Sequence, residues 1–132
     1  MTDATPKIEK LRKRRDFLAA AKARALSKGA VFVQMRPRGD GDATIRVGFT
    51  ATRKIGGAVV RNRAKRRLRE AARLLVPQLG QAGCDYVLIA RGGTTARPWP
   101  RLLDDVKSAL ISLAAQTGAA GEAHAPDPSR TG

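Results

Sequence analysis

Alternating apolar and polar residues predict strands in two stretches of the first half of the chain. Residues 31–35 form a short, mainly apolar run, and residues 44–52 alternate polar or small residues with Ile45, Val47, Phe49 and Ala51. Because neighbouring side chains of a strand point to opposite faces, one face of the second strand should pack, and the other is either exposed to solvent or the floor of a ligand site. Residues 37–42 are rich in turn formers, so we expect these two strands to form a hairpin.

Apolar residues at intervals of three and four predict three helices, with a further strand at residues 85–90. Asp16 occupies the N-cap position of the first helix, residues 17–26. The longest helix, residues 58–76, follows a glycine pair and should end before Pro77. The last helix begins at residue 99, and its apolar face comprises Leu102, Leu103, Val106, Leu110 and Leu113.

The 132 residues suffice for one domain with a core and are too few to expect two. We expect a basic, flexible arm at residues 1–9, a folded domain at residues 10–115 and a tail at residues 116–132. The tail is rich in Ala, Gly, Pro and Ser. Such a composition buries too little surface to offset the entropy lost on ordering, so the tail is predicted to be disordered.

The charge balance indicates a polyanionic partner. Lys and Arg number 26 and Asp and Glu 11, which gives a formal net charge of +15. Nucleic acid is the first candidate, an anionic membrane surface the second and a merely solvated basic surface the third. Since no apolar run resembles a signal peptide or is long enough to span a bilayer, we expect a cytoplasmic protein with no membrane partner.

The longest predicted helix separates its charges from its apolar residues. Val60, Ala64, Leu68, Ala71 and Leu75 share one side of a helical wheel, and the opposite side carries Asn62, Lys65, Arg66, Arg69 and Arg73. Residues 61–69 contain no acid, and Arg61, Arg63 and Arg67 widen the basic side. Because each like-charged pair four residues apart costs roughly 0.2–0.5 kcal/mol, a negatively charged ligand is expected, and phosphate suits the arginine fork best.

Arg53, Lys54 and the pair Gly56 and Gly57 precede this helix. Cations, glycine amides and the positive end of the helix would converge there, which predicts a phosphate cradle. A glycine pair before a helix can also be no more than a tight turn.

The chain offers no independent active site. His124, its only histidine, lies in the predicted tail, and Cys84 is its only cysteine. Asp40 and Asp42 fit a hairpin turn, and the adjacent Asp104 and Asp105 are expected to favour the helix macrodipole. We therefore predict no catalytic residue and no metal site in the protein itself.

Residues 50–70, TATRKIGGAVVRNRAKRRLRE, resemble the signature of the protein component of bacterial ribonuclease P. Flanking segments agree in order: Asp16 and Phe17, the strand with Arg46, and the later strand ending at Arg91. The resemblance covers residues 10–113. It implies an α+β fold, a single-domain, two-layer α/β sandwich of order αβββαβα with a left-handed βαβ crossover, like the second domain of ribosomal protein S5. The third strand would lie near residues 50–54.

The resemblance also implies roles for individual residues. The helix motif and the cradle would contact RNA through Arg53, Lys54, Arg61, Asn62, Arg63, Lys65, Arg66, Arg69 and Arg73. A cleft between sheet and helix would hold the single-stranded 5′ leader of precursor tRNA with Phe17, Phe32, Met35, Arg46, Thr50 and Lys54. Three residues depart from the family pattern: Ala21 and Met35 stand where aromatic residues are frequent, and Gly57 stands where Asn usually follows Gly.

By the same resemblance, a catalytic RNA subunit, expected at 1:1, removes the leader, and Mg²⁺ is bound mainly by that RNA. No protein partner is required. Two other functions fit the charge pattern: a non-enzymatic RNA-binding module, such as a ribosome-associated protein, and a basic membrane-surface protein. The second would need a free apolar face beside the cations, and the long helix is expected to use its apolar face in the core.

Overall fold

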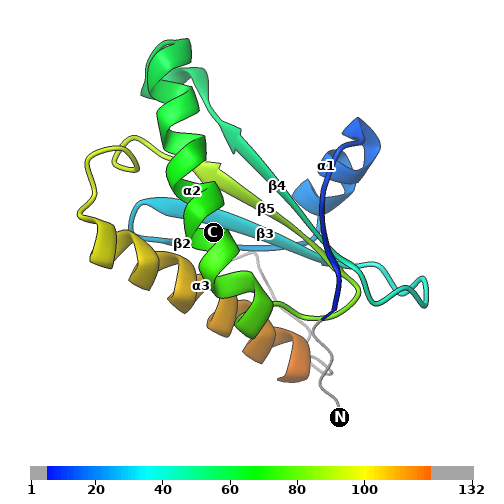
Figure 1. The fold of residues 1–132 in the computed structure, drawn as a ribbon. Coiled ribbons are helices and arrows are strands. Elements are labelled where there is room, and N and C mark those ends of the chain that lie inside the picture. Colours follow the sequence, from blue (N-terminus) through cyan, green and yellow to red (C-terminus); the bar gives the residue numbers. More distant parts are fainter. Residues whose placement is uncertain (1–5, 120–132) are drawn as a thin grey trace.

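The computed structural model describes residues 6–119, with side chains to residue 116. Seven elements follow the expected order αβββαβα, and a short strand and a 3₁₀ helix are added to them (Figure 1). In chain order they are β1 (Ile8–Lys10), α1 (Arg14–Ala21), β2 (Arg24–Lys28), β3 (Val31–Pro37), β4 (Ile45–Ala51), the 3₁₀ helix η1 (Arg53–Ile55), α2 (Ala58–Leu79), β5 (Cys84–Ala90) and α3 (Trp99–Ala119).

The five strands form one mixed sheet in the order β1-β4-β5-β3-β2. β4 and β5 are parallel neighbours joined by α2, whereas β3 is antiparallel to β5 and to β2. The predicted hairpin of β3 and β4 is therefore wrong, because β5 lies between them. The sequence of β5, CDYVLIA, explains this place, since a strand with apolar residues on both faces is best buried in the centre of a sheet.

The first predicted helix is too long. α1 ends at Ala21, and β2 follows at residues that had been assigned to the helix. β2 pairs with β3 from Arg24 opposite Met35 to Lys28 opposite Val31, so cross-strand pairing overrides a helix-favouring sequence. Gly29, with φ of 49°, makes the turn between them.

β2 supplies the strand that completes the three consecutive strands of the family order, and it comes first among them. The missing strand had been expected near residues 50–54. Those residues end β4 and begin η1. Asp16 is not the N-cap of α1. Lys13 occupies that position, and Asp16 lies in the first turn.

Three element or domain boundaries differ from those expected, near the N-terminus, at the end of α2 and at the end of α3. β1 pairs in parallel with β4, from Ile8 opposite Ile45 to Lys10 opposite Val47, so residues 8–9 of the predicted arm belong to the sheet. α2 continues through Pro77 to Leu79, where the Gly80 amide donates to the Val76 carbonyl at 2.8 Å. α3 extends to Ala119, so residues 116–119 of the predicted tail are helical; residues 120–132 lie outside the described residues.

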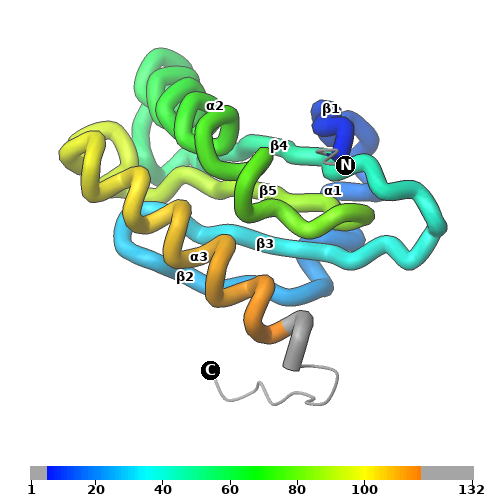
Figure 2. The backbone as a smooth tube through the Cα atoms, turned by 60° about the horizontal axis from the view of Figure 1, so that its bottom comes forward, coloured from blue at the N-terminus to red at the C-terminus, as the bar shows by residue number. Residues whose placement is uncertain are grey.

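Both long helices, α2 and α3, pack on one face of the sheet and enclose the main core (Figure 2). Strand register defines that face: Val47, Tyr86 and Met35 are neighbours across three strands and all belong to the core. The opposite face carries α1 over a smaller apolar cluster, which consists of Leu11, Ala20 and Val87 with Phe17 and Ile89 packed against it. One face of the sheet is thus covered by the two long helices, and the other is largely open.

In the described part of the chain, no helix combines the length and apolarity needed to cross a membrane.

Candidate nucleic-acid interface

The basic helix is arranged as its sequence predicts. Ala64, Leu68 and Ala71 are fully buried beneath α2, and the exposed side carries Asn62, Arg63, Arg66, Arg69 and Arg73, with Lys65 and Arg61 half-buried. Seven cations share α2 with a single acid, Glu70. A long stripe of positive charge with almost no internal neutralisation favours a phosphate-bearing ligand.

Only some of these cations are free to meet a ligand. Arg73 donates to Glu70 one turn earlier, and this hydrogen bond lowers the pKa of the Glu70 carboxyl and raises the pKa of Arg73. The Arg69 guanidinium lies 5.6 Å from the centroid of the Phe49 ring. By contrast, Arg63 and Arg66 are exposed and have no ion pair with another described residue.

Arg67 differs from the predicted RNA contacts around it. Its Nη1 donates to the carbonyl oxygens of Thr94 at 2.6 Å and Thr95 at 3.0 Å, and its guanidinium lies 5.7 Å from the centroid of the Trp99 ring. Arg67 therefore ties α2 to the start of α3. Its position on the basic side of the helical wheel did not predict that its side chain contacts the loop before α3.

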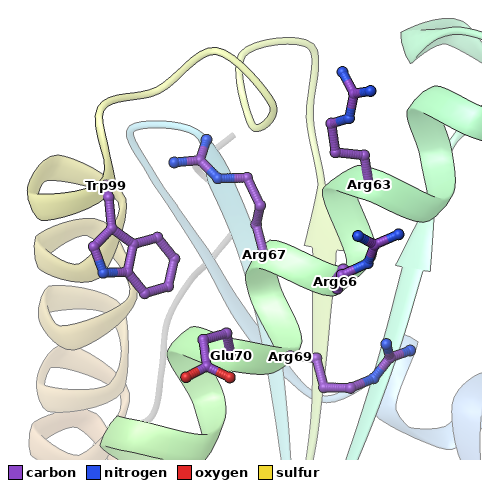
Figure 3. Close-up of a pocket in the computed structure, with 6 residues that line it drawn as sticks. All are labelled: Arg63, Arg66, Arg67, Arg69, Glu70 and Trp99. Atoms are coloured by element: carbon purple, nitrogen blue, oxygen red, sulfur yellow. The ribbon is translucent and has the colours of Figure 1, made fainter.

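Between α2 and α3 lies an open groove that we call the α2–α3 groove (Figure 3). It is lined by Arg63, Arg66, Arg67, Arg69, Glu70 and Trp99. Trp99 did not appear among the predicted site residues. As the only tryptophan of the chain, placed at the start of a helix, it was interpreted as part of the helix start alone.

The predicted cradle is a bend between η1 and α2. Gly56 has φ of 139°, a conformation that favours glycine, and Gly57 is the N-cap of α2 with no side-chain hydrogen bond to the first turn. Arg53 and Lys54 are exposed beside it. Cations and uncapped helix amides are thus close together, as an anion site requires.

On the open face of the sheet, two of the predicted cleft residues, Thr50 and Phe32, lie close together. Thr50 of β4 and Phe32 of β3 both neighbour Ile89 of β5 in the register, so the three form a row across the sheet. A hollow at the end of this row, the cleft-face groove, is lined by residues that include Phe32, Thr52, Lys54, Ile55, Ile89 and Arg91. Arg91 places its guanidinium 6.0 Å from the Phe32 ring centroid, which makes it a cleft residue that the sequence analysis missed.

Met35 is not a cleft residue. It is fully buried in the main core, on the opposite face of the sheet from Phe32. The reason is the strand period of two: Phe32 and Met35 are three positions apart on β3, so they cannot point to the same face. The predicted contact of Met35 with the leader is wrong.

Arg46, another predicted cleft residue, lies in a cluster of alternating charges. Its guanidinium is 3.4 Å from carboxylate oxygens of both Asp16 and Asp85. Arg36 also contacts both acids, and Arg38 donates to Asp85 at 2.8 Å. Asp85 is fully buried, and three arginines offset the cost of burying its charge. Arg46 is thus held in place by acids that the sequence analysis did not assign to the site.

The turn beside this cluster is confirmed. Asp40 accepts a hydrogen bond from the Asp42 amide, and Asp42 accepts one from the Thr44 amide. The Arg38 guanidinium, donating to Asp40, lowers the pKa of that carboxyl. At the other end of the sheet, Asp105 accepts hydrogen bonds from Arg97 and from the Ala30 amide, so it has a specific structural role beyond the predicted macrodipole effect.

Cys84 is a free cysteine and lies buried. Burial raises the pKa of the Cys84 thiol, which keeps it protonated and unreactive. Within residues 6–119, no group of three or more His, Cys, Asp or Glu side chains is placed to hold a metal ion. His124 lies outside the described residues.

The geometry can be compared with known proteins. A family model described as Ribonuclease P matches residues 5–114. The ribonuclease P protein component of Caulobacter vibrioides is 70% identical over 117 residues, which cover 89% of this chain and 78% of that protein. The corresponding protein of Ruegeria pomeroyi is 54% identical over 127 residues, covering 95% and 94%.

Solved structures agree with these relatives. The RNase P protein from Thermotoga maritima superposes with a TM-score of 0.67 at 28% identity, covering 78% of this chain and 96% of that chain. The RNase P protein of Staphylococcus aureus, at 22% identity, has the same fold with a TM-score of 0.67, covering 79% of this chain and 94% of that one. By its family match and its close relatives, the chain belongs to the family of bacterial ribonuclease P protein components.

Proposed function

We propose that this ribonuclease P subunit, which acts in tRNA processing, binds the catalytic RNA along α2 and holds the 5′ leader of precursor tRNA on the open face of its sheet. The observation that carries the proposal is the pairing of two different surfaces. One is a helix with seven cations and one acid, and the other is a groove that combines an aromatic ring with cations.

The α2 surface suits a folded RNA. Its exposed guanidinium groups can each contact two phosphate oxygens, and no sequence-specific contact is needed for such binding. Where two RNAs approach each other, the cations also reduce their mutual repulsion. The predicted set of RNA contacts remains as proposed, with Arg63 and Arg66 as its most available members and Arg73 partly engaged by Glu70.

The cleft-face groove suits a single strand. Phe32 offers a stacking surface, and Arg91 and Lys54 supply cations beside it. Stacking and charge together bind single strands with little demand on base sequence. Because a mature tRNA lacks the leader, contacts with Phe17, Phe32, Arg46, Thr50 and Lys54 would favour the substrate over the product.

Catalysis is proposed to lie in the RNA. Phosphate oxygens of the RNA subunit would hold most of the Mg²⁺, which supports cleavage of the phosphodiester at the mature 5′ end. The protein contributes binding and orientation. We propose one protein per RNA, no further protein partner and a cytoplasmic location, where precursor tRNA would be available.

The test is to recover the tagged full-length protein from its native cell and sequence the RNA bound to it. The eluate is then assayed for 5′ trimming of precursor tRNA with and without Mg²⁺. A single abundant structured RNA with Mg²⁺-dependent trimming is expected. Ribosomal RNA without trimming would replace the proposal with a non-enzymatic RNA-binding module.

A further inference from the structure

The α2–α3 groove has a lining that a simple phosphate site does not need. One wall is the partly buried indole of Trp99, and the other is formed by α2. In Figure 3, Glu70 extends from α2 toward the Trp99 side, whereas Arg63 and Arg66, which also line the groove, extend toward the other side. An aromatic wall contributes nothing to binding of a bare phosphate, and a carboxylate repels it. A nucleotide base, in contrast, has a flat face that can stack on an indole. It also has N–H groups that can donate hydrogen bonds to a carboxylate.

Arg67 fixes the geometry of this wall. Two backbone carbonyls, those of Thr94 and Thr95, hold its guanidinium, which in turn lies 5.7 Å from the Trp99 ring centroid. Since these contacts occupy Arg67, it is not available to follow a phosphate chain. It instead holds the loop before α3, and with it the indole, at a constant distance from α2, which lowers the entropy lost when a ring stacks there.

Arg63 and Arg66 remain for the phosphates. Both are exposed on the α2 wall, and neither has an ion pair with another described residue. Glu70 lies one turn further along and shares its carboxylate with Arg73 on the surface. An exposed ion pair of this kind contributes little, so Glu70 can exchange it for a base N–H at small cost.

The position of the groove indicates which RNA would occupy it. α2 and α3 cover one face of the sheet, whereas Phe17, Phe32 and Ile89 lie on the other. A leader strand in the cleft-face groove is therefore separated from Trp99 by the sheet and its helices. The α2 surface is the one proposed for the catalytic RNA, and this inference rests on that proposal.

We infer that the α2–α3 groove binds an unpaired nucleotide of the catalytic RNA, with its base stacked on Trp99 and its phosphates beside Arg63 and Arg66. The groove is a second single-strand site, distinct from the leader site in both location and partner. An N–H group of the stacked base would donate a hydrogen bond to the Glu70 carboxylate.

The first experiment uses the intrinsic fluorescence of the full-length protein, since Trp99 is its only tryptophan. Catalytic RNA recovered with the protein is added at near-physiological salt, and precursor tRNA and a leader oligonucleotide are added in parallel. Stacking on the indole should quench the emission, with saturation at one RNA per protein. Precursor tRNA and the leader oligonucleotide should leave the emission nearly unchanged.

Two matched substitutions separate the sites. Trp99→Leu should weaken binding of the catalytic RNA about fivefold or more, the lower limit for the loss of one stacked base, and leave leader binding unchanged. Phe32→Leu should do the reverse. Because Trp99 also packs against the core, Trp99→Phe serves as the variant that keeps a stacking ring, and it should recover most of the lost affinity. Thermal melts report whether each variant is folded.

Each outcome bears on one proposal. Quenching by catalytic RNA with the expected pattern of variants supports the inference. Normal 5′ trimming without quenching, or with unchanged RNA affinity of a folded Trp99→Leu variant, overturns it and leaves the proposed function intact. Quenching by precursor tRNA in place of the catalytic RNA overturns the assignment of the partner. Absence of trimming despite quenching by the bound RNA would instead count against the proposed function.

Discussion

A β-carbon at Gly48 would lie 2.5 Å from Cζ of Phe17. The missing side chain on β4 thus determines how closely the Phe17 ring of α1 approaches the open face of the sheet. Gly48 neighbours Val87, which belongs with Phe17 to the apolar cluster beneath α1. Phe17 is a proposed contact of the leader, so a glycine on a strand positions an aromatic residue of the binding surface.

Gly48→Ala should therefore displace Phe17. We expect a loss of roughly 1–3 kcal/mol in the free energy of unfolding, the usual cost of overpacking, measured by denaturant titration. The affinity of the protein–RNA complex for precursor tRNA, which carries the leader, should fall. Its affinity for mature tRNA, which lacks the leader, should not change. Gly93→Ala is the matched control, since its β-carbon would meet only Ala30, at 3.8 Å. Unchanged leader affinity in a folded Gly48→Ala variant would show that the Phe17 position is not important for the leader.

Periodicity alone predicted the helices of the second half and the face of α2 that packs. Ala64, Leu68 and Ala71 are buried as expected, because a helix in contact with a sheet has only one way to bury a single apolar stripe. The same logic, applied to β3, would have placed Met35 in the core, since its parity matches Val31 and Val33 and differs from that of Phe32. The family resemblance, not the pattern, led to the wrong site.

Partner choice across the sheet could not be read from local sequence. The turn at residues 37–42 favours a β3–β4 hairpin, yet β5, distant in sequence, pairs with both strands. The acids around Arg46 could not be predicted for the same reason. Asp85 contacts Arg46 because β5 is adjacent to β4, and Asp16 contacts it because α1 lies over the open face. Long-range packing also determined the conformation of residues 24–28, which pair with β3 as a strand despite their helical composition.

Arg66→Ala tests the proposed phosphate contacts on α2. Arg66 is exposed and has no ion pair with a described residue, so its loss should leave the melting temperature nearly unchanged. Affinity for the catalytic RNA should fall, and the slope of log affinity against log salt should become shallower by about 0.7–0.9, the value for one phosphate contact. The double variant Arg66→Ala and Arg69→Ala should lose roughly twice that slope.

Lys107→Ala on α3 is the control for this series, because it removes one exposed positive charge away from α2. Its salt slope should remain close to that of the unaltered protein. An equal loss of slope in Lys107→Ala would mean that the RNA responds to net charge and not to the α2 surface. Loss of helical signal in the double variant would contradict the exposure of these residues.

The adjacent glycines before α2 should respond in opposite ways to substitution. Gly57 is an N-cap with ordinary φ of −76° and open space around it, so Gly57→Asn should add a side-chain cap and stabilise the fold by a few tenths of a kcal/mol. Gly56 has φ of 139°, and its β-carbon would lie 3.0 Å from Val60, so Gly56→Ala should cost more than about 1 kcal/mol. Denaturant titrations of both variants measure the difference, and destabilisation by Gly57→Asn would contradict the cap geometry.

Inorganic phosphate should stabilise the protein through the bend at residues 53–57. Uncapped amides and the exposed Arg53 and Lys54 offer an anion more than screening, so the melting temperature should rise with phosphate at constant ionic strength. The double variant Arg53→Ala and Lys54→Ala should lose most of this rise. If chloride at the same ionic strength raised the melting temperature equally, the effect would be general screening of charge. Residues 53–57 would then be a turn and not an anion site.

Tyr86 gives an alkaline limit to stability that can be observed directly, because it is the only tyrosine. Burial raises the pKa of its phenol from 10.0 to about 12, although the Gln81 amide, which donates to its oxygen, lowers it in part. The unfolded chain releases this proton near pH 10 and the folded chain does not, so the contribution of Tyr86 is complete below pH 10 and declines as pH rises toward 12. The decline should approach about 1.4 kcal/mol per pH unit. Tyrosinate absorbance should appear near pH 12 or together with unfolding, and Tyr86→Phe, which removes the phenol, should show a smaller decline. Ionisation near pH 10 in a chain that is still folded would show that the phenol is not buried.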